Sequence, residues 1–100
     1  MTTIPIDLYI TNVLMADLVG RDRKPSAYLV YLCLTARALA MGRRRTVAVS
    51  YQRLSDATGL SRSAVQDAIR VLKRRKLVQV TRAGATATPE YEVLRPWVTR

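Results

Sequence analysis

The stretch that decides the fold of this chain runs from Ser50 to Leu72 and reads SYQRLSDATGLSRSAVQDAIRVL. Ser50 and Ser61 are of the residue type that caps the free amides at the start of a helix. Gly59 lies between them and suits the left-handed position that ends a helix. The stretch therefore predicts a short helix over 51–58, a tight turn, and a second helix from 62 to about 75.

The second of these helices has two chemically different faces. Val65, Ala68, Ile69 and Leu72 recur at the spacing of a single helix face and predict the side that packs on the core. The opposite face is polar, and its members are Arg62, Ser63, Gln66, Arg70, Lys73 and Arg74. Such a face is either simply solvated or available to a partner.

The positive charge of the chain is concentrated around the same stretch. Residues 43–82 hold eleven Lys and Arg against two Asp, a net charge of +9, and the whole chain carries +10. Residues 1–42 and 83–100 are therefore almost neutral. A field this uneven attracts polyanions, because contact with phosphates releases condensed counterions. We interpret the chain as a DNA-binding module.

The length of 100 residues predicts one domain over 1–100. We expect an N-terminal helix and linker over 7–24, in which Gly20 ends the helix. The apolar residues at helical spacing in it are Leu8, Ile10, Val13, Leu14, Leu18 and Val19. A central helix is expected over 25–42, where Pro25 and Ser26 suit the first turn and Ser26 can cap it.

The central helix is distinguished by its lack of a polar face. Thirteen of the fifteen residues from Ala27 to Met41 are apolar. A helix that is apolar nearly all round is buried on more than one side. We expect the N-terminal helix and the motif helices to cover two sides and a partner subunit to cover the rest. This predicts a homodimer through residues 7–41, and Trp97 is a further candidate for its interface.

Residues 46–76 are expected to hold a short strand at 46–49, followed by the two motif helices. Residues 77–95 are expected to form a β-hairpin, because strand-forming runs at 77–82 and 90–94 flank a loop of small residues. The expected fold class is mainly α, with three to four helices plus a small β-hairpin.

Composition excludes several classes of protein. With 49% hydrophobic residues, the chain can build a core and is not compositionally disordered. Its most apolar run, residues 27–41, is too short to span a bilayer, and no signal peptide is apparent. The single Cys33 excludes a disulfide within the chain and agrees with a reducing compartment. We expect a soluble, cytoplasmic protein.

The sequence also argues against an enzyme. It contains no histidine, no metal-ligand spacing, no phosphate-binding loop and no nucleophile triad. Tyr28 and Tyr31 could in principle act as nucleophiles, but their place in the most apolar helix favours core packing. We therefore expect no catalytic residue, no cofactor and no metal.

Several residues carry a resemblance to a known group of proteins. They are the run Gly59-Leu-Ser-Arg-Ser-Ala-Val65, then Ala68, Ile69 and Leu72, and then Leu77 and Val78. Over about residues 25–95 the pattern resembles the winged helix-turn-helix of GntR-type regulators and of plasmid and phage replication or transcription proteins. The resemblance implies that the hairpin is a wing and that the partner is double-stranded DNA.

The resemblance also implies roles for single residues. In the GntR pattern an arginine just after the cap of the recognition helix contacts DNA, and Arg62 stands at that place. Two further arginines of the pattern are replaced here by Gln52 and Gln66, which implies a different target sequence, although glutamine can pair with adenine. Many members have glycine where Lys76 stands. The effector domain of such regulators has no counterpart here, so no small-molecule ligand is expected.

The candidate site has two sets of residues. The expected DNA base contacts are Arg62, Ser63, Gln66 and Arg70. The expected DNA-backbone and wing contacts are Arg43, Arg44, Arg45, Tyr51, Gln52, Arg53, Lys73, Arg74 and Arg82. Arg82 fits either a minor-groove contact or an ordinary edge-strand residue. Asp67 is expected to be a local ion-pair partner.

These observations lead us to interpret the chain as a small, sequence-specific transcriptional regulator that acts on the nucleoid as a homodimer. One alternative is a plasmid or phage replication or partition accessory factor built on the same module. Another is a winged-helix module that binds protein or structured RNA. Competition between duplex DNA and RNA would separate this last alternative from the others.

Overall fold

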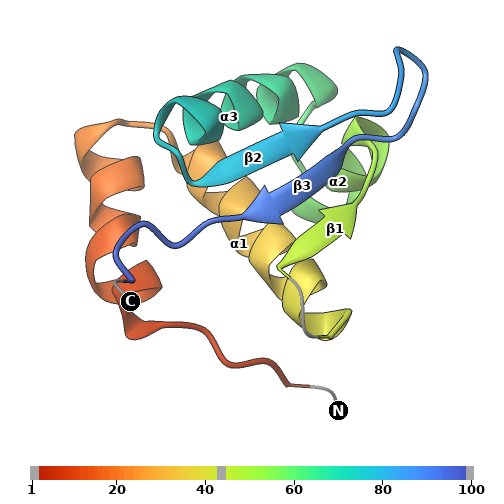
Figure 1. Cartoon of the computed structure of the whole chain (residues 1–100). Coiled ribbons are helices and arrows are strands. Elements are labelled where there is room, and N and C mark those ends of the chain that lie inside the picture. The colour runs from red at the N-terminus through yellow and green to blue at the C-terminus, as the bar shows by residue number, and fades with distance from the viewer. Residues whose placement is uncertain (1–2, 43–44, 99–100) are drawn as a thin grey trace.

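The computed structural model describes residues 3–42 and 45–98, in which a small sheet packs with one face on a group of helices (Figure 1). The helical elements are η1 (Ile10–Leu14), η2 (Ala16–Arg21), α1 (Pro25–Ala40), α2 (Tyr51–Thr58) and α3 (Arg62–Arg74). The strands are β1 (Thr46–Ala48), β2 (Val78–Thr81) and β3 (Glu90–Val93). The expected order of helices and strands is confirmed, with ends that shift by a residue or two.

The three strands form one antiparallel sheet in the order β1-β3-β2, so the last strand of the chain lies in the middle. Tyr91 of β3 is paired with Val47 of β1. Because side chains alternate along a strand, Tyr91 and Val93 lie in the core, whereas Glu90 and Glu92 are exposed. The hairpin of β2 and β3 is confirmed, and its pairing with β1 goes beyond the sequence prediction.

Helix α1 lies behind the sheet and forms the centre of the core (Figure 1). It contacts α2, α3, η2, β1 and β3, so elements of its own chain surround it. Its buried side chains are Ala27, Tyr28, Val30, Tyr31, Leu34, Thr35 and Ala38. Burial on several sides is therefore confirmed. The sheet covers a side that the expected helices left open, whereas Leu29 of α1 remains 44% exposed, so a partner subunit over the remainder stays a prediction.

The N-terminal helical segment has the wider turn of a π-helix and not that of an α-helix. The amide of Met15 donates to the carbonyl of Ile10, and the amide of Asp22 donates to the carbonyl of Asp17 at 2.8 Å. These are the i to i+5 bonds of a π-helix. Gly20 lies within η2 and does not end it, so the expected stop signal at this glycine is wrong.

The buried face of this N-terminal helix is narrower than expected. Ile10, Leu14 and Leu18, each four residues apart, are buried in the core. Three other members of the expected apolar stripe remain exposed, namely Leu8, Val13 and Val19. Half of the expected apolar stripe is therefore buried as predicted, and the other half leaves apolar side chains on the surface.

Local side-chain chemistry sets the ends of α2 and α3. The Ser50 hydroxyl accepts a hydrogen bond from the Arg53 amide, and the Ser61 hydroxyl accepts one from the Ala64 amide, both at 3.1 Å. Gly59 ends α2 with φ of 80°, a conformation that glycine adopts without a steric penalty. These caps are confirmed. The cap expected from Ser26 is wrong, because α1 begins after Lys24 with no side-chain cap.

Ion pairs tie the end of α3 to the N-terminal helix. Arg75 Nη1 lies 2.6 Å from an Asp22 carboxylate oxygen, and Arg75 Nη2 lies 3.1 Å from one of Asp17. Arg75 is thereby turned away from any external partner, unlike the exposed Lys73 and Arg74. The next residue, Lys76, has φ of 58° in the left-handed region and turns the chain into β2. This is the position at which the resembling proteins often carry glycine.

Candidate nucleic-acid interface

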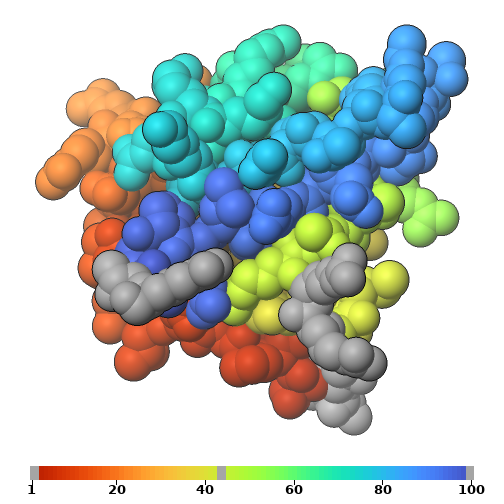
Figure 2. All heavy atoms as spheres, viewed as in Figure 1, coloured from red at the N-terminus to blue at the C-terminus, as the bar shows by residue number. Residues whose placement is uncertain are grey.

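A surface hollow brings together the starts of α2 and α3 and the loop between β2 and β3. We call it the α2–α3 hollow, and its volume is about 560 Å³. The residues that line it are Ser50, Tyr51, Gln52, Arg62, Gln66, Arg82, Thr86, Ala87, Thr88 and Pro89. The β2–β3 loop extends well beyond the sheet at the upper right of Figures 1 and 2. Three parts of the chain therefore converge on one open surface.

Two of the four expected base contacts lie in this hollow. Arg62 is the first residue of α3 and is exposed beside the Ser61 cap. Gln66 follows about one turn later and lines the same hollow. The core stripe of Val65, Ala68, Ile69 and Leu72 is fully buried, as predicted. Burial of that stripe is what turns Arg62 and Gln66 outward.

The other two expected base contacts, Ser63 and Arg70, lie outside the hollow. The Ser63 hydroxyl is 3.3 Å from the hydroxyl of Ser61. Arg70 lies 3.8 Å from Asp67, which also accepts a hydrogen bond from Lys24 at 3.3 Å. The expected role of Asp67 as a local ion-pair partner is confirmed. A base contact by Ser63 or Arg70 stays a prediction.

Arg82 is held at the edge of the hollow by two contacts. Its guanidinium lies 5.9 Å from the centre of the Tyr51 ring, within the range of a cation–π interaction. Its Nη1 donates to the carbonyl of Ala85 at 3.3 Å. Arg82 therefore links the base of the β2–β3 loop to the first residue of α2.

Tyr91 packs beside this hollow without adding charge to it. Its hydroxyl is buried and has no hydrogen-bond partner among the described residues. Burial raises the pKa of Tyr91, and the nearby Tyr51 hydroxyl raises it further. An ordinary tyrosine is already neutral at physiological pH, and the raised pKa moves Tyr91 further from ionisation, so no phenolate there repels a phosphate.

The remaining expected backbone contacts lie partly in the hollow and partly away from it. Gln52 lines it and donates to the Asp56 carboxylate at 2.9 Å. Lys73 and Arg74 are exposed in the last turn of α3, outside the hollow. Arg45, half-buried, precedes β1. Arg43 and Arg44 lie outside the described residues.

Sequence reasoning missed Arg37, which lies on α1. Its side chain lines a second hollow, of about 320 Å³, together with Ala48, Val49, Ser50, Arg53 and Thr88. Arg37 is the single charged residue between Ala27 and Met41. A lone arginine in so apolar a helix was the signal that could have found it, because such a side chain has to reach solvent.

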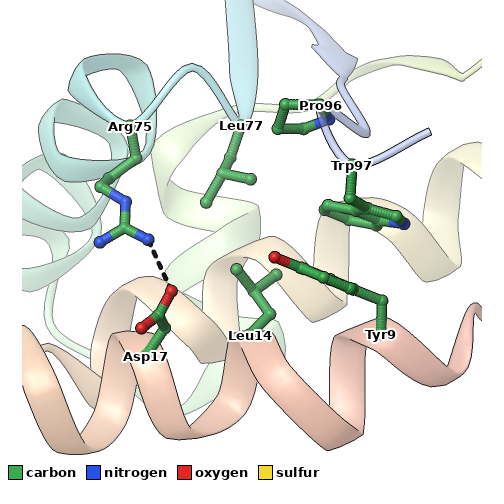
Figure 3. A pocket seen from close by; sticks show the side chains of 7 residues that line it. All are labelled: Tyr9, Leu14, Asp17, Arg75, Leu77, Pro96 and Trp97. Atoms are coloured by element: carbon green, nitrogen blue, oxygen red, sulfur yellow. Dashed lines mark hydrogen bonds and ion pairs between the residues drawn. The ribbon is translucent and has the colours of Figure 1, made fainter. Parts of the chain in front are cut away.

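A third hollow, shown in Figure 3, lies where the C-terminal segment packs against the N-terminal helix. Tyr9 and Trp97 stack with ring centres 4.5 Å apart, and the Trp97 Nε1 donates to Asp7 at 3.2 Å. Arg95 also pairs with Asp7, at 3.1 Å. These contacts fasten the C-terminal segment to the N-terminal helix. Because Trp97 is engaged within its own chain, its expected place in a dimer interface receives no support.

Comparison of the chain with protein-family models, with curated proteins and with solved structures finds no match. Within residues 3–42 and 45–98, no helix has the length and apolarity needed to cross a membrane. The same residues include no group of three or more His, Cys, Asp or Glu that could hold a metal ion. A function for this chain therefore has to be inferred from the geometry and charge of the hollows.

Proposed function

We propose that this chain is a winged helix-turn-helix protein that binds double-stranded DNA sequence-specifically, as a small transcriptional regulator acting on the nucleoid in the cytoplasm. In this proposal α3 is the recognition helix, and the hairpin within residues 77–95, which holds β2, β3 and the loop between them, is the wing. The observation that carries it is the α2–α3 hollow, where Arg62, Gln66 and Arg82 converge from different parts of the chain. A recognition helix typically contacts bases through its N-terminal residues, and Arg62 and Gln66 lie there.

The charges around the hollow support a polyanionic partner. In the part of the chain that the structure describes, Arg62 and Arg82 make no ion pair with a carboxylate, so their charges are available. The exposed glutamates Glu90 and Glu92 lie on the outer face of the sheet. A bound duplex would meet the arginines of α3 and the wing and leave that acidic face to solvent.

Duplex DNA is favoured over structured RNA by the kind of element that carries the site. Arg62 and Gln66 project from a helix, and the major groove of B-form DNA is wide enough to admit a helix. The major groove of A-form RNA is too narrow and deep for this mode of binding. A replication or partition accessory factor would use the same surface and is the second candidate, because the hollow is compatible with either role.

The first prediction is that DNA affinity falls steeply with salt. Each phosphate that the protein neutralises should add about 0.9 to the steepness of log affinity against log salt. The Arg43–Arg82 segment, with its net charge of +9, is expected to make several such contacts. Fluorescence anisotropy with a labelled duplex over a range of salt concentrations measures the slope, and an RNA duplex of the same sequence serves as competitor. Affinity that does not change between low and physiological salt would contradict the proposal.

The proposed homodimer rests on the exposed side of the N-terminal helix. Leu8 is 75% exposed. Three further apolar residues of the same segment, Val13, Met15 and Val19, are also exposed, and so is Leu29 of α1. Residues 1–42 carry four cations and three anions. Two chains of charge +10 would repel least if they met through this nearly neutral part. A second copy of the chain is therefore the proposed occupant of this face, within residues 7–41.

The second prediction concerns this assembly. Sedimentation of the free protein at high micromolar concentration is expected to give the mass of a dimer. Leu8→Glu should shift the mass to that of a monomer, because a charge would have to be buried in an apolar contact. Ala85→Glu is the matched control, since Ala85 is exposed in the β2–β3 loop, outside residues 7–41, and the substitution introduces the same charge. A wild-type protein that is strictly monomeric would rule out the dimer.

A further inference from the structure

Two arginines from different helices share a hollow next to the proposed DNA site. Arg37 of α1 and Arg53 of α2 line it together with Ser50 and Thr88. The same two arginines also line an adjoining open depression with Asp56 and Ala57. Two arginines that line one hollow place two positive charges at the same surface, and this favours an anion there.

The described part of the chain supplies no such anion in the form of an ion pair. Neither Arg37 nor Arg53 is within ion-pair distance of a carboxylate among residues 3–42 and 45–98. Asp56 borders the depression on one side, but it accepts the Gln52 amide at 2.9 Å. The side formed by the first hollow is lined, apart from the two arginines, by neutral residues, namely Ala48, Val49, Ser50 and Thr88. An external anion would be held on that side.

The position of this hollow suggests which anion it takes. It shares Ser50 and Thr88 with the α2–α3 hollow, so the two surfaces are contiguous. A DNA strand whose bases face Arg62 and Gln66 and whose backbone passes Ser50 would continue toward Arg37 and Arg53. Guanidinium groups bind phosphate through paired, charge-assisted hydrogen bonds.

We propose that Arg37 and Arg53 together bind one phosphate of the DNA backbone that flanks the bases read by α3. This inference rests on the proposed function and extends its footprint to the central helix, which the sequence assigns to the core. The aliphatic part of the Arg37 side chain would then cross the edge of the core. Its guanidinium group would fix the position of the duplex. It positions the DNA and reads no base.

The test is an Arg37→Ala variant assayed by anisotropy on a labelled duplex at several salt concentrations. Loss of one whole phosphate contact would weaken binding about eightfold near 0.1 M salt and lower the salt slope by about 0.9. Because Arg53 remains in this variant, these values are upper limits for Arg37→Ala, and the loss should be equal for preferred and random sequences. Arg37→Lys should keep most of the slope, because the charge remains. Arg21→Ala is the matched control, since it removes one exposed arginine of η2, away from the DNA-facing hollows, and it should leave both quantities unchanged; sedimentation of this variant verifies that its mass is that of the wild type.

Three further measurements separate the outcomes. Circular dichroism of Arg37→Ala should show an intact helical fold, because the substitution removes no buried apolar group except part of the arginine stem. A duplex shortened on the flank that meets α1 should bind wild type and Arg37→Ala with equal affinity. Inorganic phosphate added to the free protein should bind weakly; tight, Arg37-dependent binding of phosphate with no effect on DNA would overturn the inference.

Failure of the inference can be distinguished from failure of the proposed function. A wild-type protein that does not bind duplex DNA contradicts both. If the wild type binds with a steep salt slope and Arg37→Ala behaves as Arg21→Ala does, the flanking phosphate site alone is wrong. Arg53→Ala provides a second variant, and it should weaken binding to the same degree as Arg37→Ala if both residues hold one phosphate.

Discussion

Replacing Leu72 with alanine is expected to lower the free energy of unfolding by about 2–5 kcal/mol. Leu72 has an exposed fraction of 0% and is the last residue of the core stripe on α3. The truncation removes apolar contacts and leaves a cavity in a close-packed interior, which relaxes only in part. A domain of this size has a total stability of only about 5–15 kcal/mol, so the loss would be a large fraction of it.

Urea unfolding followed by circular dichroism measures this change. Val98→Ala is the control, because Val98 is 45% exposed near the C-terminus and its truncation should change stability by less than about 0.5 kcal/mol. Equal stability of the two variants would mean that α3 is not packed through the stripe of Val65, Ala68, Ile69 and Leu72. In that case the outward direction of Arg62 and Gln66 would lose its physical basis as well.

The features that the sequence predicts well here are those set by neighbouring residues. Ser50 and Ser61 cap the helices that follow them because their hydroxyls reach amides three residues away. Gly59 ends α2 because glycine tolerates a positive φ. The stripe on α3 follows from the period of the helix alone. All of these depend on distances along the chain of a few residues, which a sequence displays directly.

The features that were missed depend on contacts between distant segments. Pairing of β1 with β3 joins residues more than forty positions apart, and no local pattern encodes it. That pairing supplies the sheet that covers one side of α1, which the expected helices alone left open. The π-helical geometry of the N-terminal helix is a second feature of this kind. The Asp22 amide donates to the Asp17 carbonyl, and the carboxylates of both residues form ion pairs with Arg75, which is distant in the sequence.

Some residues of the candidate site are likewise predictable from local sequence, whereas others come together only through packing of distant segments. Arg62 and Gln66 are predictable from the face of one helix, and the structure places both in the α2–α3 hollow. Arg37 and Arg53 become neighbours only when α1, α2 and β1 pack together. Ser63 and Arg70 share the polar face of α3 but lie outside the hollow, because only part of that face lines the hollow.

The last prediction concerns which residues read the bases. Arg62→Ala or Gln66→Ala is expected to cost roughly 1–3 kcal/mol of binding free energy on the preferred duplex and to relax the sequence preference. An arginine can donate two hydrogen bonds to guanine, and a glutamine can pair with adenine through both its donor and its acceptor. Both side chains lie in the first turns of α3, where a recognition helix enters the groove.

Selection of binding sites from random duplex DNA gives the preferred sequence, and anisotropy then compares that sequence with a scrambled duplex. Lys73→Ala is the matched variant, because it removes a cation from the exposed last turn of the same helix. It should weaken both duplexes equally and lower the salt slope by about one. Arg62→Ala should instead reduce the ratio of the two affinities. If Arg62→Ala weakens the preferred and the scrambled duplex by the same factor, Arg62 contacts the backbone, and the bases are read elsewhere.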